Sequence, residues 1–225
     1  MALILNIDTA LDTASVSLAK DGLVLQQAIS ENQKDHASWL HIAIEELLQK
    51  TGHTIKEVEA VAVSIGPGSY TGLRVGLASA KGLCYALNIP LIAINTLTLI
   101  AFAAQKEAQS DDLICPMIDA RRMEVFTALY NSELQEIESA DALLIDENSF
   151  AEKLHSKKII FCGNGSKKLQ QIISLPNAIF SGIVAGPADL AQLSYKSFRN
   201  KEFVSLAYTD PLYIKEFYSP TTRLV

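Results

Sequence analysis

The stretch from Ser64 to Gly76 constrains the fold of this chain most, because it reads Ser-Ile-Gly-Pro-Gly-Ser-Tyr-Thr-Gly-Leu-Arg-Val-Gly. An apolar run over residues 60–65 leads into it, and an apolar-periodic run that ends near residue 87 follows it. This pattern predicts a turn between a buried strand and a helix. In open α/β sheets, ligands bind beyond the carboxyl ends of strands, next to helix N-termini. We therefore expect the functional site at this turn.

Two familiar phosphate-binding loops do not fit the stretch. A Walker loop needs Gly-Lys-Ser/Thr at a set offset from its first glycine, whereas the cation nearby is Arg74. The dinucleotide fingerprint fails because Gly66, Gly68 and Gly72 have one residue too many between them, and because Asn95 stands where an acid is required. The spacing therefore argues against both forms of nucleotide binding.

The predicted helix over residues 71–87 has one face of small residues. At about 100° per residue, Arg74 and Lys81 project away from a sector that holds Gly72, Gly76, Ser79, Ala80 and Leu83. Glycine inside a helix costs about 0.5–1 kcal/mol relative to alanine, so Gly76 and Gly82 need an explanation. Either the small face packs on its own sheet, or it admits a helix of another subunit. The sequence leaves both interpretations open.

Composition narrows the class of protein. With 225 residues and 49% hydrophobic content the chain can bury two modest cores, so we predict two linked lobes. A net charge of −6 and a pI near 5.2 argue against independent nucleic-acid binding. The three cysteines lack Cys-x-x-Cys spacing, as in reduced intracellular chains. No signal peptide or apolar run of about 18–20 residues is present, so we expect a cytoplasmic protein that does not contact membranes.

The periodicity predicts strands, helices and their order along the first half. Strands are expected over residues 3–7, 13–19, 23–29, 60–65 and 91–94, and helices over 36–50, 71–87 and 96–108, with Thr96 as a cap. This βββαβαβα order predicts an α/β fold, a mixed sheet with helices on both faces. It resembles one lobe of the actin-like (ribonuclease H-like) superfamily. The first lobe is predicted to span residues 1–109.

The second half, residues 110–225, is predicted to be a smaller α/β lobe. Strands are expected over residues 113–118, 124–130 and 159–162, a helix over 187–198, and strand-like structure around 212–214. We expect this lobe to be reduced and too short to repeat the first lobe in full. For its last helix, packing back on the first lobe is one of the arrangements we expect.

Four motifs in order along the chain resemble the TsaB (YeaZ) family: Ile7-Asp8-Thr9-Ala10, Gly66-Pro67-Gly68-Ser69-Tyr70-Thr71-Gly72-Leu73-Arg74, Asp119-Ala120-Arg121-Arg122-Met123-Glu124-Val125 and Asp210-Pro211-Leu212-Tyr213. The resemblance implies an accessory subunit for making threonylcarbamoyladenosine at position thirty-seven of tRNAs that read codons beginning with adenine. It implies a catalytic TsaD-like paralogue and a TsaE-like ATPase as partners, tRNA contact through the complex, and a homodimer when the chain is alone. The family is also labelled glycoprotease-like.

The partner surface is expected on the first lobe, around the glycine-rich stretch and the helix that follows it. The candidate partner-binding residues are Gly66, Pro67, Gly68, Ser69, Tyr70, Thr71, Gly72, Arg74, Gly76, Ser79, Ala80 and Leu83. The helix over residues 36–50 is a second candidate element. Candidate nucleotide or cleft residues are Asp8, Thr9, Asp119, Arg121, Gly163 and Gly165.

No catalytic group or metal site is predicted. His36 and His41 are five residues apart, so their side chains diverge by about 140° around a helix and do not suit one metal ion. Ser64 and Ser69 lie outside any Gly-x-Ser-x-Gly motif. We expect no cofactor in the isolated chain, with ATP and Mg²⁺ only at an interface shared with the partner. The alternatives are an actin-like small-molecule kinase and a metal-dependent peptidase.

Overall fold

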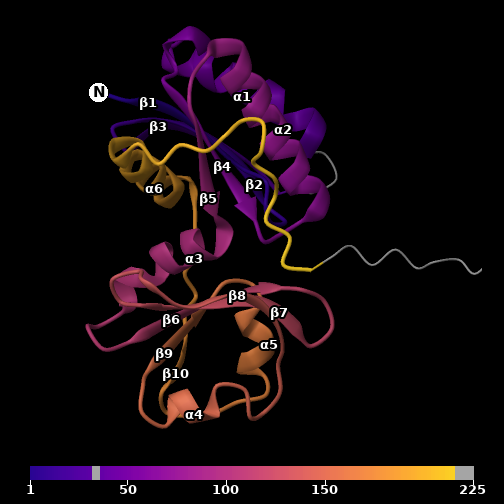
Figure 1. The fold of residues 1–225 in the computed structure, drawn as a ribbon, viewed down its shortest axis with the longest axis vertical. Helices are drawn as coiled ribbons and strands as arrows, with labels where there is room; N and C mark the ends of the chain where they lie inside the picture. Colours follow the sequence, from indigo (N-terminus) through magenta and orange to yellow (C-terminus); the bar gives the residue numbers. More distant parts are fainter. Residues whose placement is uncertain (32–35, 216–225) are drawn as a thin grey trace, which may run out of the picture.

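Two five-stranded mixed sheets form the two halves of the molecule (Figure 1). The structure, a computed structural model, describes residues 1–31 and 36–215, without the side chain of His36. The first sheet has the order β3-β2-β1-β4-β5. Its strands are β1 (Leu3–Asp8), β2 (Ala14–Lys20), β3 (Leu23–Ser30), β4 (Ala60–Gly66) and β5 (Leu91–Asn95). β1 pairs antiparallel with β2 and parallel with β4, as expected of a hairpin start followed by crossover helices.

Helices cover both faces of the first sheet, which explains why β4 is an almost uninterrupted apolar run. Helices α1 (His36–Thr51) and α2 (Tyr70–Leu87) share one hydrophobic core with the sheet, in which Leu47 and Leu77 are buried. Helices α3 (Thr96–Ala104) and α6 (Pro187–Asn200) contribute Leu99 and Leu190 to a second core on the opposite face. The predicted order of strands and helices in this half is confirmed.

The second half repeats the strand connectivity of the first. Its strands are β6 (Leu113–Asp119), β7 (Glu124–Asn131), β8 (Glu136–Leu144), β9 (Ile159–Cys162) and β10 (Ala178–Phe180), and its short helices are α4 (Ala151–Leu154) and α5 (Ser166–Gln170). The sheet order β10-β9-β6-β7-β8 matches that of the first sheet element for element. The prediction that this half is too short to repeat the first was wrong: its helices are shortened, but its strands are all present.

Two strands of the second sheet were missed for identifiable reasons. β8 lies at the sheet edge and is mostly exposed, so it carries the acidic sequence Glu-Ile-Glu-Ser-Ala-Asp rather than an apolar alternation. β10 has three residues and pairs in parallel with β9, which is too short a run for any periodicity to show.

Helices α3 and α6 connect the two halves. α3 packs on the second sheet through Leu97, Ile100, Ala101 and Ala104, while Leu99 faces the first. α6 follows the last strand of the second half and returns to the first sheet, where the Ser194 hydroxyl donates a 2.5 Å hydrogen bond to Asn6 Oδ1 of β1. The predicted lobe boundary after residue 109 lies in the connection between the 3-10 helix η3 (Gln105–Glu107) and β6.

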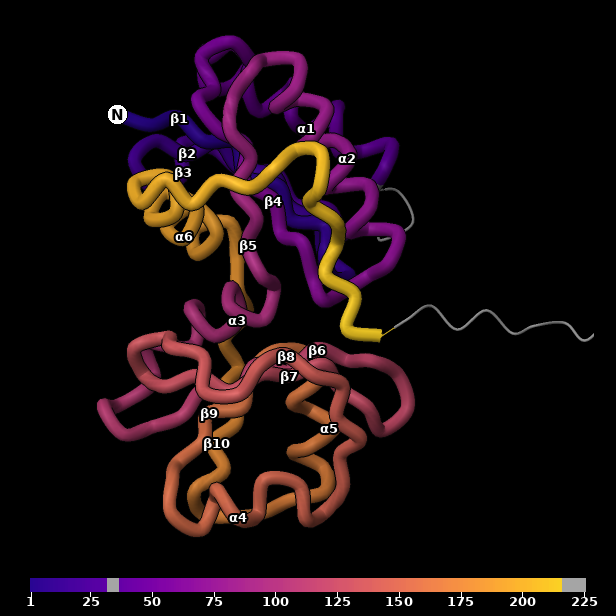
Figure 2. The backbone as a smooth tube through the Cα atoms, in the orientation of Figure 1, coloured from indigo at the N-terminus to yellow at the C-terminus, as the bar shows by residue number. Residues whose placement is uncertain are grey.

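Two local predictions need correction. Asn95, not Thr96, caps α3, because its Oδ1 accepts hydrogen bonds from the amides of Leu97 and Thr98. The helix ends at Ala104 and continues only as η3. Residues 212–214 form no strand; they belong to an extended segment after α6 that runs along the first half and then toward the second (Figure 2). The rest of the predicted tail, residues 216–225, lies outside the described residues.

Candidate functional site

The glycine-rich turn before α2 is interlocked with the turn between β1 and β2. The Ser69 amide donates a 2.6 Å hydrogen bond to the Ala10 carbonyl, and the buried Thr9 hydroxyl donates a 2.7 Å hydrogen bond to the Gly72 carbonyl. Ser69 also caps α2, because its Oγ accepts from the Gly72 amide at 3.3 Å. Two motifs far apart in the sequence thus form one packed unit.

Side chains at three of the glycines would collide with that turn. A Cβ at Gly68 would lie 2.2 Å from the Ala10 carbonyl oxygen, one at Gly72 2.0 Å from the Thr9 carbonyl oxygen, and one at Gly76 2.3 Å from Thr9 Oγ1. Each distance is far below van der Waals contact. The glycines therefore allow α2 to approach its own sheet.

The prediction that a partner helix approaches the small face of α2 was wrong. Gly72, Gly76 and Ala80 are buried against the first half, and Leu83 packs on the same core. Ser79 faces α1, where its Oγ lies 3.2 Å from His41 Nε2. A larger side chain at Gly72 or Gly76 would disturb the fold itself rather than only an interface.

The opposite side of α2 faces outward, and we call it the α2 outer face. It comprises Tyr70, Thr71, Arg74, Ala78, Gly82 and Tyr85, all exposed. Tyr85 is 84% exposed, and Ile42 on the neighbouring α1 is 58% exposed. Apart from its chain neighbours and the backbone of α2 itself, no described atom comes within 4 Å of a Cβ built at Gly82. Of the predicted partner-binding residues, Tyr70, Thr71 and Arg74 belong to this face.

A cleft of about 920 Å³ lies between the two halves. Its lining includes Asp12 and Ser69 from the first half, and Asp119, Arg121 and Asn164 from the second. The segment after α6 contributes Leu212, Tyr213, Ile214 and Lys215 to the same lining. Asp119 and Arg121 were predicted at the cleft, and the structure brings both to it.

The other four predicted cleft residues do not line it. Thr9 is fully buried, and Asp8 accepts from the Ser64 hydroxyl at 2.5 Å and from the Ala10 amide at 3.0 Å. Gly163 and Gly165 pack on β6, where added Cβ atoms would lie 2.4 Å from the Met117 carbonyl oxygen and 2.9 Å from the Ile118 carbonyl carbon. Both glycines serve close backbone packing.

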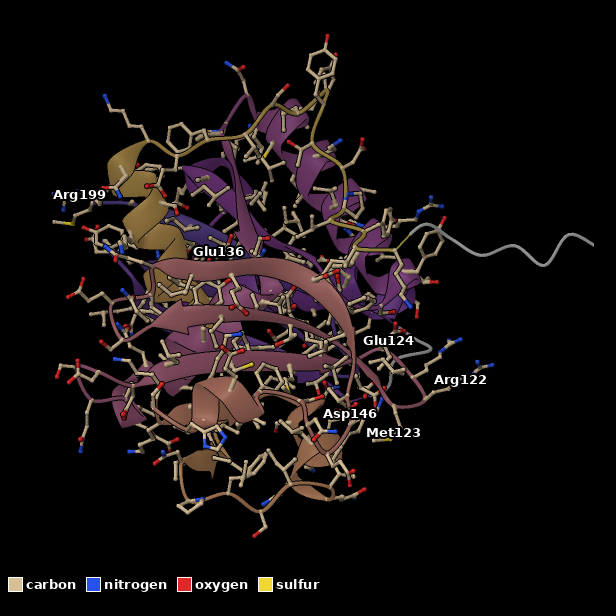
Figure 3. All side chains as sticks on the ribbon, turned by 60° about the horizontal axis from the view of Figure 1, so that its bottom comes forward. Arg122, Met123, Glu124, Glu136, Asp146 and Arg199 are labelled. Carbon is tan, nitrogen blue, oxygen red and sulfur yellow. The ribbon has the colours of Figure 1, made fainter. Side chains whose placement is uncertain are left out.

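Asp119 organises the turn between β6 and β7. Its Oδ1 lies 2.7 Å from Lys168 Nζ and accepts from the Arg121 amide at 2.7 Å. Partial burial opposes the charged form, but these hydrogen bonds outweigh it and lower the pKa of Asp119 below its ordinary value. Arg121 and Arg122 follow with φ of 71° and 47°, in the left-handed region that costs about 1–3 kcal/mol per non-glycine residue. Figure 3 shows Arg122 pointing away from the ribbon beside Met123 and Glu124.

The residues present do not fit a phosphate–magnesium group of the kind that the actin-like fold suggests. Asp8 and Thr9 are engaged by Ser64, Ala10 and Gly72, and the Ser69 amide is already bonded to Ala10. Within residues 1–31 and 36–215, no group of three or more His, Cys, Asp or Glu side chains is placed to hold a metal ion. His41 contacts Ser79, and the side chain of His36 lies outside the described part.

Tyr213 is the most highly connected of the site residues that sequence reasoning missed, which also include Asp12, Asn164, Leu212, Ile214 and Lys215. Its ring lies 5.2 Å from that of Tyr70, and its hydroxyl accepts a 3.1 Å hydrogen bond from Arg74 Nε. The Arg74 guanidinium also lies 4.1 Å above the Tyr70 ring. Arg74 and Tyr213 are 139 positions apart, so no local pattern could pair them, although both stand in motifs that carried the family resemblance.

The chain is similar to several known proteins. A family model described as TsaD, tRNA N6-adenosine threonylcarbamoyltransferase, matches residues 24–206. The tRNA threonylcarbamoyladenosine biosynthesis protein TsaB of Bacillus subtilis (strain 168) is 30% identical over 173 residues, which cover 76% of this chain and 74% of that protein. The structure of YeaZ from Pseudomonas aeruginosa has a TM-score of 0.81 and 26% identity, over 95% of this chain and 100% of that chain. A candidate N-acetylmannosamine kinase of Listeria monocytogenes shares the fold at a TM-score of 0.50 and 9% identity, over 89% of this chain and 99% of that chain.

These similarities agree with the motifs and with the architecture. The likeness to the Listeria protein concerns the fold alone, and with the two repeated sheets it confirms the predicted α/β two-lobe, actin-like class. No described helix combines the length and apolar character needed to span a membrane. The interlocked Asp8–Ala10 and Gly66–Gly72 motifs, the fold and the matches over most of the chain lead to one conclusion: the chain belongs to the TsaB (YeaZ) family.

Proposed function

We propose that this chain is a non-catalytic accessory subunit of the assembly that forms N6-threonylcarbamoyladenosine at position thirty-seven of tRNAs reading codons that begin with adenine. It binds a TsaD-like catalytic paralogue, works with a TsaE-like ATPase, and contacts tRNA through the complex. The names of the relatives and the description of the family model support a role in this modification. We place the protein in the cytoplasm and expect a homodimer when the partner is missing.

The observation that carries the proposal is the exposed Gly82. A glycine inside a helix is unfavourable by about 0.5–1 kcal/mol relative to alanine. Gly72 and Gly76 are explained by their contacts with Thr9, whereas no described residue lies near a Cβ at Gly82. We infer that this glycine serves an intermolecular contact: it lets the backbone of a partner helix approach the α2 outer face.

The surroundings of Gly82 suit such a contact. Ala78 lies one turn before it on the same face, Tyr85 adds a large exposed aromatic group, and Ile42 is exposed on the neighbouring helix α1. Aromatic side chains anchor many protein interfaces, and small residues between them leave room for the partner's own side chains. We therefore propose the α2 outer face and the exposed side of α1 as the surface for the paralogue.

Hydrogen bonds and burial of the candidate nucleophiles support the non-catalytic assignment. Ser64 donates to Asp8 and Ser69 caps α2, so both hydroxyls have structural partners. Burial raises the pKa of the Cys84 thiol to about 11 and that of Cys115 to about 12, which disfavours the thiolate that a cysteine nucleophile needs. We assign the chemistry to the paralogue.

Reconstitution tests the proposal. Threonylcarbamoylation of tRNA by the paralogue, the ATPase and the donor-forming enzyme is measured with and without this chain, and with its Gly82→Leu variant. We expect modification to depend on the wild-type chain and to be lost with Gly82→Leu. Gln192→Leu, at another exposed helix position, on α6, is the control and should retain full activity. Modification that proceeds equally well without the chain would reject the proposal, and turnover by the chain alone would reject its non-catalytic part.

A further inference from the structure

The segment after α6, residues 204–215, crosses the first half and reaches the second; we call it the C-terminal strap (Figures 1 and 2). It begins with a β-bridge between Val204 and Leu91, in which the Val204 amide donates a 3.0 Å hydrogen bond to the edge of the first sheet. Val204 and Leu206 then pack against the core shared with α1 and α2. The strap is thus docked on the first half at its start, while its middle, around Tyr208, is exposed.

Four consecutive strap residues contact the two halves in turn. The Leu212 amide donates a 2.7 Å hydrogen bond to the Ile65 carbonyl of β4, and Tyr213 contacts Tyr70 and Arg74 of α2. Ile214 packs on the core of α3 and the second sheet. Lys215 forms an ion pair with Glu124 of β7. The strap therefore bridges the cleft.

The absence of a side chain at Gly66, in the glycine-rich stretch, leaves room for the strap. A Cβ at Gly66 would lie 2.7 Å from the Leu212 carbonyl oxygen, and the residue has φ of 117°, a conformation that favours glycine. The same Cβ would also lie 3.0 Å from Leu73 Cδ1 of α2. The first glycine of the motif thus leaves room for the backbone of Leu212, which is far away in the sequence.

The strap is also continuous with the α2 outer face. A groove of about 440 Å³ lies between them, lined by Arg74, Ala78 and Lys81 of α2 and by Asp210, Pro211 and Tyr213 of the strap. Arg74 belongs to the outer face and also holds the Tyr213 hydroxyl. A protein bound to the outer face next to this groove would therefore contact Arg74, the side chain that holds the strap through Tyr213.

We propose that residues 212–215 form a latch, which holds the two halves at a fixed separation and couples the width of the cleft to the state of the α2 outer face. The coupling to a partner rests on the proposed function, whereas the latch itself is a property of the isolated chain. When the latch is docked, Tyr213 holds the first half, and Ile214 and Lys215 hold the second. When a bound protein displaces the Arg74 side chain, Tyr213 loses its hydrogen bond, and the two halves can then move apart and open the cleft.

Spin labels on the two halves measure the latch directly. Cysteines are introduced at the exposed Lys56 and Ser156, and because Cys84, Cys115 and Cys162 are all buried, the label reacts selectively with the introduced sites. The latch variant is Tyr213→Ala with Lys215→Ala. The matched control is Tyr208→Ala with Lys196→Ala, which removes the same residue types from exposed positions. Pulsed electron paramagnetic resonance gives the distance distribution, and hydrogen exchange reports on the amides of residues 68–71 and 120–124.

We expect one narrow distance distribution in the parent and in the control, a broader one in the latch variant, and severalfold faster exchange of the cleft amides in that variant. Arg74→Ala should broaden the distribution as well, although it leaves the strap sequence intact. Unchanged distributions in both the latch variant and Arg74→Ala would overturn the proposal. No partner is added, so failure of the latch and failure of the proposed function give different results.

If the double alanine variant does not fold, exchanging the charges of Glu124 and Lys215 tests the latch instead. Glu124→Lys places two cations together and should broaden the distribution, and Glu124→Lys combined with Lys215→Glu should narrow it again. Raised salt should weaken the effect, because the pair is partly exposed. A combined variant that stays as broad as Glu124→Lys alone would overturn the role of the ion pair, and with it the latch.

Discussion

The Thr9 hydroxyl donates its hydrogen bond to the Gly72 carbonyl oxygen across 2.7 Å, and the two residues are 63 positions apart in the sequence. This contact joins the β1–β2 turn to the first turn of α2. It explains why the chain carries a threonine in one motif and closely spaced glycines in the other: the hydroxyl needs a partner when buried, and the helix must approach closely to supply one.

Alanine at two glycines of α2 should have opposite effects on stability. At Gly76, a Cβ would lie 2.3 Å from Thr9 Oγ1, so we expect Gly76→Ala to lower the free energy of unfolding by about 1–3 kcal/mol. At Gly82 the space is open among the described residues, so Gly82→Ala should raise it by about 0.5–1 kcal/mol through helix propensity. Urea denaturation of the two variants measures both. Equal destabilisation would mean that Gly82 packs against something within the chain.

Truncation of Tyr85 should separate binding from stability. Its side chain is 84% exposed, so Tyr85→Ala should change the free energy of unfolding by less than about 0.5 kcal/mol. Because we propose that the Tyr85 ring lies in the interface, Tyr85→Ala should weaken binding to the TsaD-like paralogue by at least about 2 kcal/mol, or about 30-fold in Kd. Isothermal titration calorimetry measures the affinity, with the 88% exposed Tyr208→Ala as control. Equal affinities of both variants would place the interface elsewhere.

The Asp119 carboxylate should make the free energy of unfolding depend on pH in the acid range. Because its pKa is lowered in the folded state, its contribution is fully present above the ordinary value of 3.8 and is lost as the pH falls through the folded-state pKa. The difference in unfolding free energy between wild type and Asp119→Asn should therefore be constant near neutral pH and shrink in acid. Denaturation at a series of pH values checks this, with Glu152→Gln on α4 as an exposed control. A difference that grows in acid would contradict the Lys168 pairing.

Helix α6 should be required for the first half. Leu190 is 1% exposed in the core between α6 and the first sheet, so Leu190→Ala should lower the free energy of unfolding by about 2–5 kcal/mol. Hydrogen exchange should then rise in β1 and β5 as well as in α6. Protection that falls only within the second half would show that α6 belongs energetically to that half.

The isolated chain should respond to neither nucleotide nor metal. A kinase of the same fold would bind ATP–Mg²⁺ and gain thermal stability from it, and a metal-dependent peptidase would retain stoichiometric metal. We expect no shift of Tm with ATP–Mg²⁺ and no bound metal by elemental analysis. A clear upward shift of Tm would instead favour the kinase, and one metal ion per chain would favour the peptidase.

Much of the fold could be predicted from local patterns. The three-residue and four-residue spacing of Leu40, Ala43, Ile44 and Leu47 predicts α1, and the apolar run before Gly66 predicts β4. These signals work because an element must bury one face or both, and burial leaves a period in the sequence. The sequence of β8 shows no such period, since an exposed edge strand does not have to bury a face.

The sequence by itself determined the family, the element order of the first half and the place of the glycine-rich turn, because these depend on residues that are neighbours along the chain. Only the tertiary structure decided which face of α2 points away from the sheet, since periodicity separates two faces but does not say which one meets the sheet. It also decided that Tyr213 docks on Arg74 and that Gly66 makes room for Leu212, because such contacts depend on the path of the chain through space.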